Sequence, residues 1–166
     1  MVHRNDDSNE KESRPPELKD IIELARALNQ HGAKYVIVGG IAVIQQGFTR
    51  ATEDIDLLIE KKPENLKKVI DAVANLPDHA AREISPSDFE EFEVIRVADE
   101  IVVDLMASAA GIDFKQAESG IVHVEIQGVL IPFADAELLI KMKQGVREKD
   151  VIDRRFLEQL LRNRSS

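Results

Sequence analysis

The sequence predicts an α+β domain in which helices flank a mixed sheet. Three observations carry this prediction: apolar residues recur at helical spacing in several segments, short apolar runs bounded by turn residues lie between them, and the two kinds alternate irregularly. The predicted order is helix, strand, helix, strand, helix, hairpin, helix, hairpin and two closing helices. Because no repeat or internal linker divides the 166 residues, we predict a single domain over residues 17–164.

Residues 1–16 are polar, charged and end in two prolines, which predicts a disordered tail. The elements that follow carry start and stop signals, such as Gly32 after the first helix and Pro63 in the first turn of the third. In order, the predicted elements are a helix from Leu18 to near Gly32, a strand over Tyr35–Val38, a short helix over Gly40–Gln46, a strand over Ile55–Glu60 and a helix from Pro63.

The C-terminal half is predicted from turn residues and a capping signal. Ser87 followed by Glu90 has the spacing of a capping box, which predicts a short helical turn near 88–91. The remaining predicted elements are a hairpin of Phe92–Val97 and Ile101–Met106, a helix over 112–118, a hairpin of Ile121–Ile126 and Val129–Ile131, and two helices over about 135–144 and 148–162.

The composition is that of a soluble globular protein, with 43% hydrophobic and 32% charged residues. The chain has no cysteine, which excludes disulfides and thiolate zinc sites, and its four histidines lack metal-ligand spacing. No apolar run approaches the roughly 20 residues of a membrane span, and the N-terminus lacks the apolar core of a signal peptide. We therefore expect a cytoplasmic protein with no membrane partner.

The net charge of −9 is unevenly distributed. Residues 141–166 hold eight basic and four acidic residues, a net +4, which leaves −13 for the other 140 residues. The acidity fits carboxylates that are assembled to hold cations, and the basic end could face a polyanion. A solvated helix of mixed charge explains the outward basic residues equally well.

Asp54 and Asp56 form the first part of a candidate site. Side chains alternate along a strand, so these two carboxylates point to the same face and Ile55 points into the core. Hard cations such as Mg²⁺ take one or two carboxylates together with substrate phosphates. Such pairs are also common on surface strands, so the pair by itself is weak evidence for a site.

Gly39 and Gly40 form the second part, at the end of a buried strand and the start of a helix. Glycine permits close backbone approach, and helix-initial N–H groups attract phosphate, so we predict a phosphate-binding turn. The alternative is a tight strand-to-helix turn that only requires small residues.

Asp104 is the third part, because it interrupts an otherwise apolar strand over Ile101–Met106. An unpaired buried carboxylate is costly, so Asp104 must meet a cation, a donor or solvent. If this strand pairs beside residues 54–60, Asp104 joins Asp54 and Asp56 as a third metal ligand. The alternative is a carboxylate at the open end of an edge strand.

The block from Gly39-Gly40 to Asp56, with the pattern R-x-T-x-D-I-D and a later Asp104, resembles the nucleotidyltransferase superfamily of the DNA polymerase β type. It is similar to two groups in particular: the lincosamide and aminoglycoside nucleotidyltransferases, and the toxin-type nucleotidyltransferases of abortive-infection systems. The toxin-type pattern is also matched near the C-terminus, by Lys141, Arg147, Lys149, Asp150 and Asp153. The resemblance covers residues 18–162 and implies the polymerase β-like fold with C-terminal helices.

The chain departs from these groups at two positions. Many superfamily members have Gly-Ser in place of Gly39-Gly40, so a serine hydroxyl contact to phosphate is missing here. The drug-modifying group usually has an aromatic residue after the glycines, where this chain has Ile41, which argues against an antibiotic-resistance enzyme.

The resemblance implies Mg²⁺-dependent transfer of a nucleoside monophosphate from an NTP to a hydroxyl acceptor, with two ions and with Mn²⁺ as a substitute. Asp54 and Asp56 would hold both cations, and Asp104 would bind the acceptor-side metal and take the acceptor's proton. Pyrophosphate would leave. The acceptor could be a small molecule, a protein side chain or an RNA end.

Four further residues are predicted to bind the nucleotide. Arg50 and Thr52 lie just upstream of the acidic pair, and Arg50 could donate to the triphosphate or brace a carboxylate. Lys141 and Lys149 could neutralise phosphate charge from the closing helices. The alternatives are a surface loop for Arg50, solvated helix surface for the lysines, and for Lys149 an i,i+4 pair with Asp153.

Asp150 and Asp153 are expected to orient Lys141 and Lys149 or to cap the last helix, and not to bind metal. A non-catalytic alternative uses the same fold as a nucleotide-binding or antitoxin-like interaction module. All three carboxylates are present, which favours catalysis. Nucleic-acid binding as the sole function is disfavoured because aromatic residues, which supply stacking platforms, make up only 4% of the chain.

Overall fold

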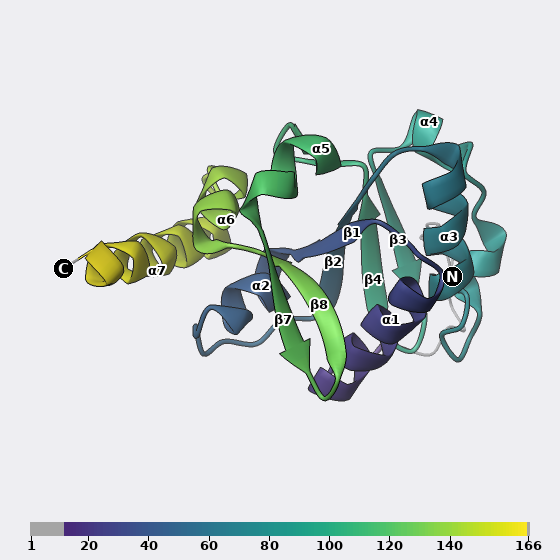
Figure 1. Ribbon diagram of the computed structural model, residues 1–166, viewed down its shortest axis with the longest axis horizontal. Helices are drawn as coiled ribbons and strands as arrows, with labels where there is room; N and C mark the ends of the chain where they lie inside the picture. Colours follow the sequence, from purple (N-terminus) through teal and green to yellow (C-terminus); the bar gives the residue numbers. More distant parts are fainter. Residues whose placement is uncertain (1–11, 166) are drawn as a thin grey trace.

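A six-stranded mixed sheet forms the centre of the computed structural model, which describes residues 12–165 (Figure 1). The strand order is β3-β4-β2-β1-β8-β7, so β3 and β7 are the two edges. Its strands are β1 (Tyr35–Val38), β2 (Asp54–Ile59), β3 (Val94–Ala98), β4 (Val102–Met106), β7 (Ile121–Ile126) and β8 (Val129–Ala134). A separate pair consists of β5 (Ser108–Ala109) and β6 (Ile112–Asp113). The predicted α+β class with a mixed sheet is confirmed.

Helices surround the sheet, and the last of them extends away from it toward the C-terminus (Figure 1). Their bounds are α1 (Leu18–Gln30), α2 (Gly39–Gln45), α3 (Pro63–Val73), α4 (Asp88–Glu91), α5 (Phe114–Ala117), α6 (Ala136–Met142) and α7 (Glu148–Ser165). Two 3₁₀ turns, η1 (Ala80–Glu83) and η2 (Glu118–Gly120), complete the chain. None of the helices within residues 12–165 combines the length and the apolarity that a membrane crossing requires.

The register of the central strands aligns the polar residues of the predicted site. β1 runs antiparallel to β2, with Val38 opposite Asp56. β2 runs parallel to β4, with Asp56 opposite Asp104. β3 runs antiparallel to β4, with Arg96 opposite Asp104. Residues paired in register point to the same face, so Asp56, Asp104 and Arg96 form one row across three neighbouring strands.

The core explains why these strands lie at the centre. Every residue of β1 is buried, and in β2 the residues alternating with the two carboxylates, Ile55 and Leu57, are fully buried. Burying an apolar side chain of this size contributes about 1.5–3 kcal/mol, so a shift of register by one residue would bury Asp54 and Asp56 at the expense of Ile55 and Leu57. The hydrophobic pattern therefore fixes the face on which the carboxylates lie.

Two residues upstream of the predicted boundary at residue 17 contact the folded part of the chain. Most of the predicted tail, residues 1–11, lies outside the described residues. Further along, the Ser13 hydroxyl donates to the Asp99 carbonyl at 2.7 Å, and the Arg14 guanidinium pairs with Asp20 at 2.7 Å. This pairing lowers the pKa of Asp20. Composition alone did not reveal it, because it depends on a specific fold contact.

Two other predictions need correction. The segment predicted as a helix over 112–118 begins instead with the two-residue strand β6, which is followed by the single turn of α5 and by η2. Asp113 caps α5 by accepting from the Gln116 N–H at 2.8 Å. β8 continues through Pro132 to Ala134, whereas the predicted strand ended at Ile131. A proline is tolerated here because β8 pairs with β1 at one residue pair only, Ile37 with Phe133.

Candidate active site

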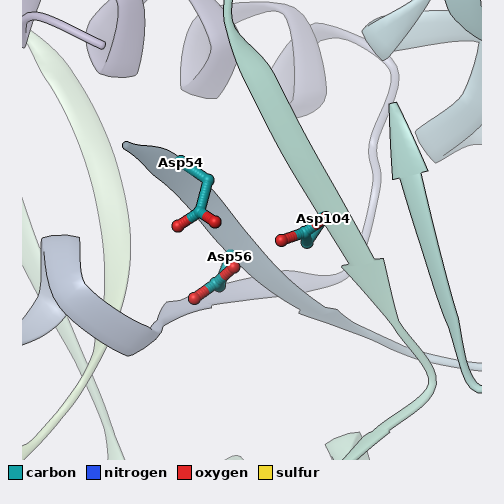
Figure 2. A group of neighbouring side chains, drawn as sticks. All are labelled: Asp54, Asp56 and Asp104. Atoms are coloured by element: carbon teal, nitrogen blue, oxygen red, sulfur yellow. The ribbon is translucent and has the colours of Figure 1, made fainter. Parts of the chain in front are cut away.

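The three predicted carboxylates converge at the sheet (Figure 2). One oxygen from each of Asp54, Asp56 and Asp104 lies within 4.8 Å of the other two. The first two come from alternate positions of β2 and the third from the parallel neighbour β4, so strand geometry alone brings them together. The juxtaposition that the sequence argument required is therefore present.

The electrostatics of this acidic cluster favour the approach of positive charge. Burial, together with the nearby charges of Asp54 and Asp104, raises the pKa of Asp56 to about 8. Burial and the Asp104 charge also raise the pKa of Asp54. Three carboxylates this close resist joint ionisation unless positive charge is added. An all-oxygen donor set of this kind fits Mg²⁺ or Mn²⁺.

Both glycines of the predicted phosphate turn are required by the packing at the start of α2. Gly39 has a φ of +67°, and a Cβ there would overlap the Oδ2 atom of Asp56. A Cβ on Gly40 would come within 2.7 Å of the Thr52 hydroxyl and 2.9 Å of the Arg50 guanidinium. The turn thus lets the backbone approach the acidic cluster closely. Binding of phosphate by its N–H groups stays a prediction.

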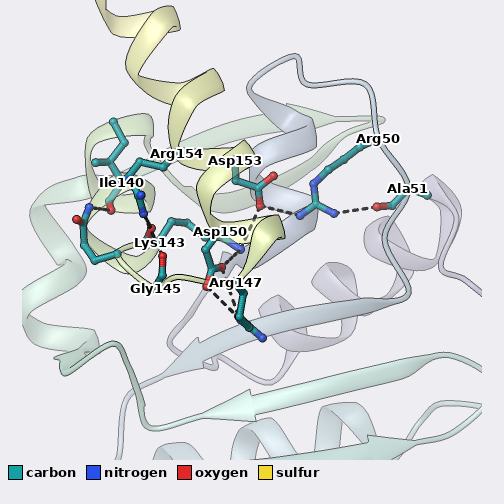
Figure 3. A network of polar contacts seen from close by, with 10 residues as sticks. Arg50, Ala51, Ile140, Lys143, Gly145, Arg147, Asp150, Asp153 and Arg154 are labelled. Carbon is teal, nitrogen blue, oxygen red and sulfur yellow. Dashed lines mark hydrogen bonds and ion pairs between the residues drawn. The ribbon is translucent and has the colours of Figure 1, made fainter.

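Arg50 braces a carboxylate, which is one of the two roles predicted for it. Its guanidinium donates to Asp153 Oδ2 at 2.9 Å and to the Ala51 carbonyl at 2.8 Å (Figure 3). Asp153 lies on α7 and is fully buried. Thr52 directs its hydroxyl toward the Asp54 carbonyl at 3.4 Å. The loop that leads into β2 is therefore tied to the last helix.

Asp150 and Asp153 pair with basic residues, as predicted, but with different ones. The Lys143 ammonium lies 3.2 Å from Asp153 Oδ2 and 3.6 Å from Asp150 Oδ1, and the Arg147 Nε lies 3.1 Å from Asp150 Oδ2 (Figure 3). The expected i,i+4 pair between Lys149 and Asp153 is not among the ion pairs within residues 12–165. These contacts join α6, α7 and the loop between them.

Lys143, which the sequence analysis did not identify, directly follows α6, and its charge reaches the acidic cluster. It opposes the effect of burial and of the neighbouring carboxylates on the pKa of Asp56. Lys149 acts in the same sense on Asp54, after the larger effects of burial, Asp104 and Arg96. Lys141 is exposed. Lys143 caps α6 with a non-helical backbone, so its direction relative to Lys141 does not follow from helical spacing, and the sequence offers no signal for choosing between them.

Arg96 is the second residue that the sequence analysis missed. Its Nε donates to Asp104 Oδ1 at 2.9 Å, and its Nη2 donates to Asp104 Oδ2 at 2.9 Å and to Asp54 Oδ2 at 3.0 Å. The hydrogen bond with Asp104 is the main cause of its raised pKa. The signal was present, since strand alternation in the predicted hairpin places Arg96 on the same face as Asp104.

The comparison with known protein families agrees with the class that the fold and the acidic cluster indicate, the nucleotidyltransferases. The family described as "Nucleotidyltransferase of unknown function (DUF6036)" matches residues 16–153. The chain therefore belongs to this nucleotidyltransferase family, as its resemblance to the superfamily indicated. No curated protein matches the chain.

Three solved structures show the same fold. The lincosamide antibiotic adenylyltransferase LnuA, bound to lincomycin, is 14% identical with a TM-score of 0.58, over 89% of this chain and 99% of LnuA. The TM1012 protein of Thermotoga maritima, which is assigned to the nucleotidyltransferases, is 18% identical with a TM-score of 0.51, over 86% and 92%. An antigenic nucleotidyltransferase-like protein of Paracoccidioides brasiliensis is 19% identical with a TM-score of 0.55, over 87% and 76%. The predicted nucleotidyltransferase fold is confirmed.

Proposed function

We propose that this nucleotidyltransferase uses Mg²⁺ to transfer a nucleoside monophosphate from an NTP to a hydroxyl acceptor. The observation that carries the proposal is the convergence of Asp54, Asp56 and Asp104 within 4.8 Å on one sheet face. Family membership supports nucleotidyl transfer in general, and the carboxylates supply the ligands that the chemistry requires.

Asp54 and Asp56 would hold two divalent cations, and Asp104 would complete the ligand set on the acceptor side, with Mn²⁺ able to replace Mg²⁺. When bound, such cations neutralise phosphate charge and stabilise the entering and leaving oxygens of an in-line displacement. Asp104 would also accept the proton of the acceptor hydroxyl. The pyrophosphate leaving group would depart from the opposite side.

Positive side chains between α6 and the first turn of α7 supply the phosphate side of the proposed site. Lys143 and Lys149 act on the pKa values of Asp56 and Asp54, so their charges reach the acidic cluster. The pKa of Arg147 is raised chiefly by its hydrogen bond with Asp150, and Asp56 also contributes. We propose that these three residues neutralise the triphosphate.

The other predicted nucleotide contacts are assigned smaller roles. We propose that Arg50 and Thr52 shape the loop beside the nucleotide and that Gly39 and Gly40 allow its close approach. Lys141 stays a prediction as a peripheral phosphate contact. The acceptor is a small molecule, a protein or an RNA end, and LnuA, whose name gives lincosamide adenylylation, is an example of the first class.

Transfer of label tests the proposal. Purified protein with MgCl₂ and each of the four α-labelled NTPs would be incubated with metabolite, protein and RNA fractions of a cell extract. We expect one fraction to become labelled, and Asp54→Asn or Asp104→Asn to lower the rate at least about 100-fold. Circular dichroism would show that both variants remain folded, because each change removes a like charge from the cluster.

Asp71→Asn is the matched control, since Asp71 lies on α3 in an exposed i,i+4 pair with Lys67. This variant should transfer label at the wild-type rate. Transfer that proceeds unchanged in Asp54→Asn or Asp104→Asn would remove that residue from the proposed site.

A further inference from the structure

Arg96 donates hydrogen bonds to two of the proposed metal ligands, Asp104 and Asp54. Its guanidinium contacts both oxygens of Asp104, and the same Nη2 that bonds Asp104 Oδ2 also reaches Asp54 Oδ2. A planar guanidinium matches a carboxylate in this bidentate geometry and is always charged. Arg96 therefore links β2 and β4 through the two carboxylates on which a cation would depend.

A divalent cation bound to Asp54 and Asp104 would compete directly with this arrangement. Metal–oxygen distances of about 2.0–2.1 Å would place the ion close to a guanidinium that lies 2.9–3.0 Å from the same carboxylates. The two positive charges would repel each other across a few ångströms in a partly buried site, where screening is weak. The carboxylate of Asp104 cannot bind the cation and the Arg96 guanidinium together without a large loss of attraction to each.

The surroundings of Arg96 allow it to move. It lies on β3, an edge strand of the sheet, and its side chain is 47% exposed. Its only polar side-chain partners within residues 12–165 are Asp54 and Asp104. Release from these two carboxylates would thus place the guanidinium in solvent without leaving another buried group unpaired.

We propose that Arg96 is the internal counter-cation of the acidic cluster, which pairs with Asp104 and Asp54 and is displaced when a divalent cation binds. The proposal rests on the assignment of the carboxylates as metal ligands. Arg96 is a positioning residue in this scheme: it neutralises the cluster and keeps Asp104 aligned, and it lowers metal affinity because it must be released first. Binding of the divalent cation and release of Arg96 from Asp104 and Asp54 are then coupled.

A different role for Arg96 predicts the opposite sign. If Arg96 stayed paired with Asp104 and only oriented it toward the cation, loss of the guanidinium would weaken metal binding, as loss of an outer-shell partner usually does. The direction of the change in metal affinity therefore separates the two roles.

The experiment is a Mn²⁺ titration of the full chain without nucleotide, followed by electron paramagnetic resonance of free Mn²⁺ at fixed pH and salt. We expect Arg96→Met to bind Mn²⁺ at least about 10-fold more tightly than wild type, a change of about 1.4 kcal/mol. Arg96→Lys, which keeps the charge but loses the bidentate fork, should fall between them. Arg82→Met removes the same charge from an exposed arginine of η1 and should leave the affinity unchanged.

A second measurement covers the case in which Arg96→Met folds poorly. Its melting temperature should be lower than that of wild type in EDTA, and Mn²⁺ should raise it more than it raises that of wild type. If wild type binds Mn²⁺ and Arg96→Met binds it equally tightly or more weakly, the counter-cation role is overturned and the proposed function stays intact. Failure of both wild type and Arg96→Met to bind Mn²⁺ would overturn the metal site, and the proposal with it.

Discussion

Replacement of Asp153 by alanine should destabilise the protein more than any surface change. Asp153 is fully buried, and its Oδ2 accepts from Arg50 at 2.9 Å and lies 3.2 Å from the Lys143 ammonium. The side chains of Arg50 and Lys143 are only 17% and 13% exposed, so the variant leaves two largely buried cations without this partner. Removing one member of a buried ion pair costs about 3–5 kcal/mol.

The lower end of this range is the expected loss, because Lys143 keeps Asp150 at 3.6 Å and Arg50 keeps the Ala51 carbonyl. About 3 kcal/mol is a large part of the 5–15 kcal/mol by which domains are usually stable. Urea unfolding followed by circular dichroism would measure it as a lower midpoint at constant slope.

The exposed pair of Lys67 and Asp71 provides the control. Asp71→Ala should cost less than about 0.5 kcal/mol, since exposed i,i+4 pairs contribute little. A loss below about 1 kcal/mol for Asp153→Ala would show that the network in Figure 3 does not hold α7 to the loop before β2. That result would return Arg50 to the triphosphate role that its position in the sequence first suggested.

Three further changes test other parts of the structure. Gly39→Ala should cost about 1–2 kcal/mol of stability through its positive φ and abolish Mn²⁺ binding by displacing Asp56, whereas Gly128→Ala, with a φ of +79° and open space around it, should lose stability alone. Without divalent cations, the free energy of unfolding should fall as pH rises from about 4 to about 8. The reason is that the folded state, in which the pKa of Asp56 is raised from 3.8 to about 8, binds the proton more tightly than the unfolded chain. Asp56→Asn should flatten this dependence in urea titrations at several pH values. Asp99→Ala, which removes an acceptor of the Asp78, Ala80 and Glu100 N–H groups, should cost about 2–3 kcal/mol by thermal unfolding.

The acidic cluster could be predicted from the sequence because it depends on short-range rules. Alternation along a strand places Asp54 and Asp56 on one face, and the apolar residues around Asp104 mark its carboxylate as anomalous. Only one long-range condition was needed, the pairing of β2 with β4, and the structure supplies it.

The basic side of the site could not be predicted in the same way. Arg50 and Asp153 are separated by 103 positions, and the sequence holds many charges of either sign that could have paired with them. The choice of Lys143 over Lys141 depends on where α6 ends and on the ion pairs of Lys143 with Asp150 and Asp153 of α7. Arg96 was within reach, since its face followed from the predicted hairpin, but an arginine on an edge strand usually indicates solvent exposure.

These contacts show where several of the basic residues concentrated after residue 140 lie in the structure. Of the basic excess after residue 140, Lys143, Arg147 and Lys149 interact electrostatically with the two carboxylates of β2, Asp54 and Asp56, while Asp150 and Asp153 hold Lys143 and Arg147 in place. The acidic cluster therefore has a positive residue on each side, Arg96 from the edge strand and Lys143 from the closing helices. The side that α7 anchors is fixed by buried ion pairs, whereas the Arg96 side is exposed. In the scheme we propose, a cation would enter from the exposed side by displacing Arg96, and the anchored side would stay in place to meet the phosphates.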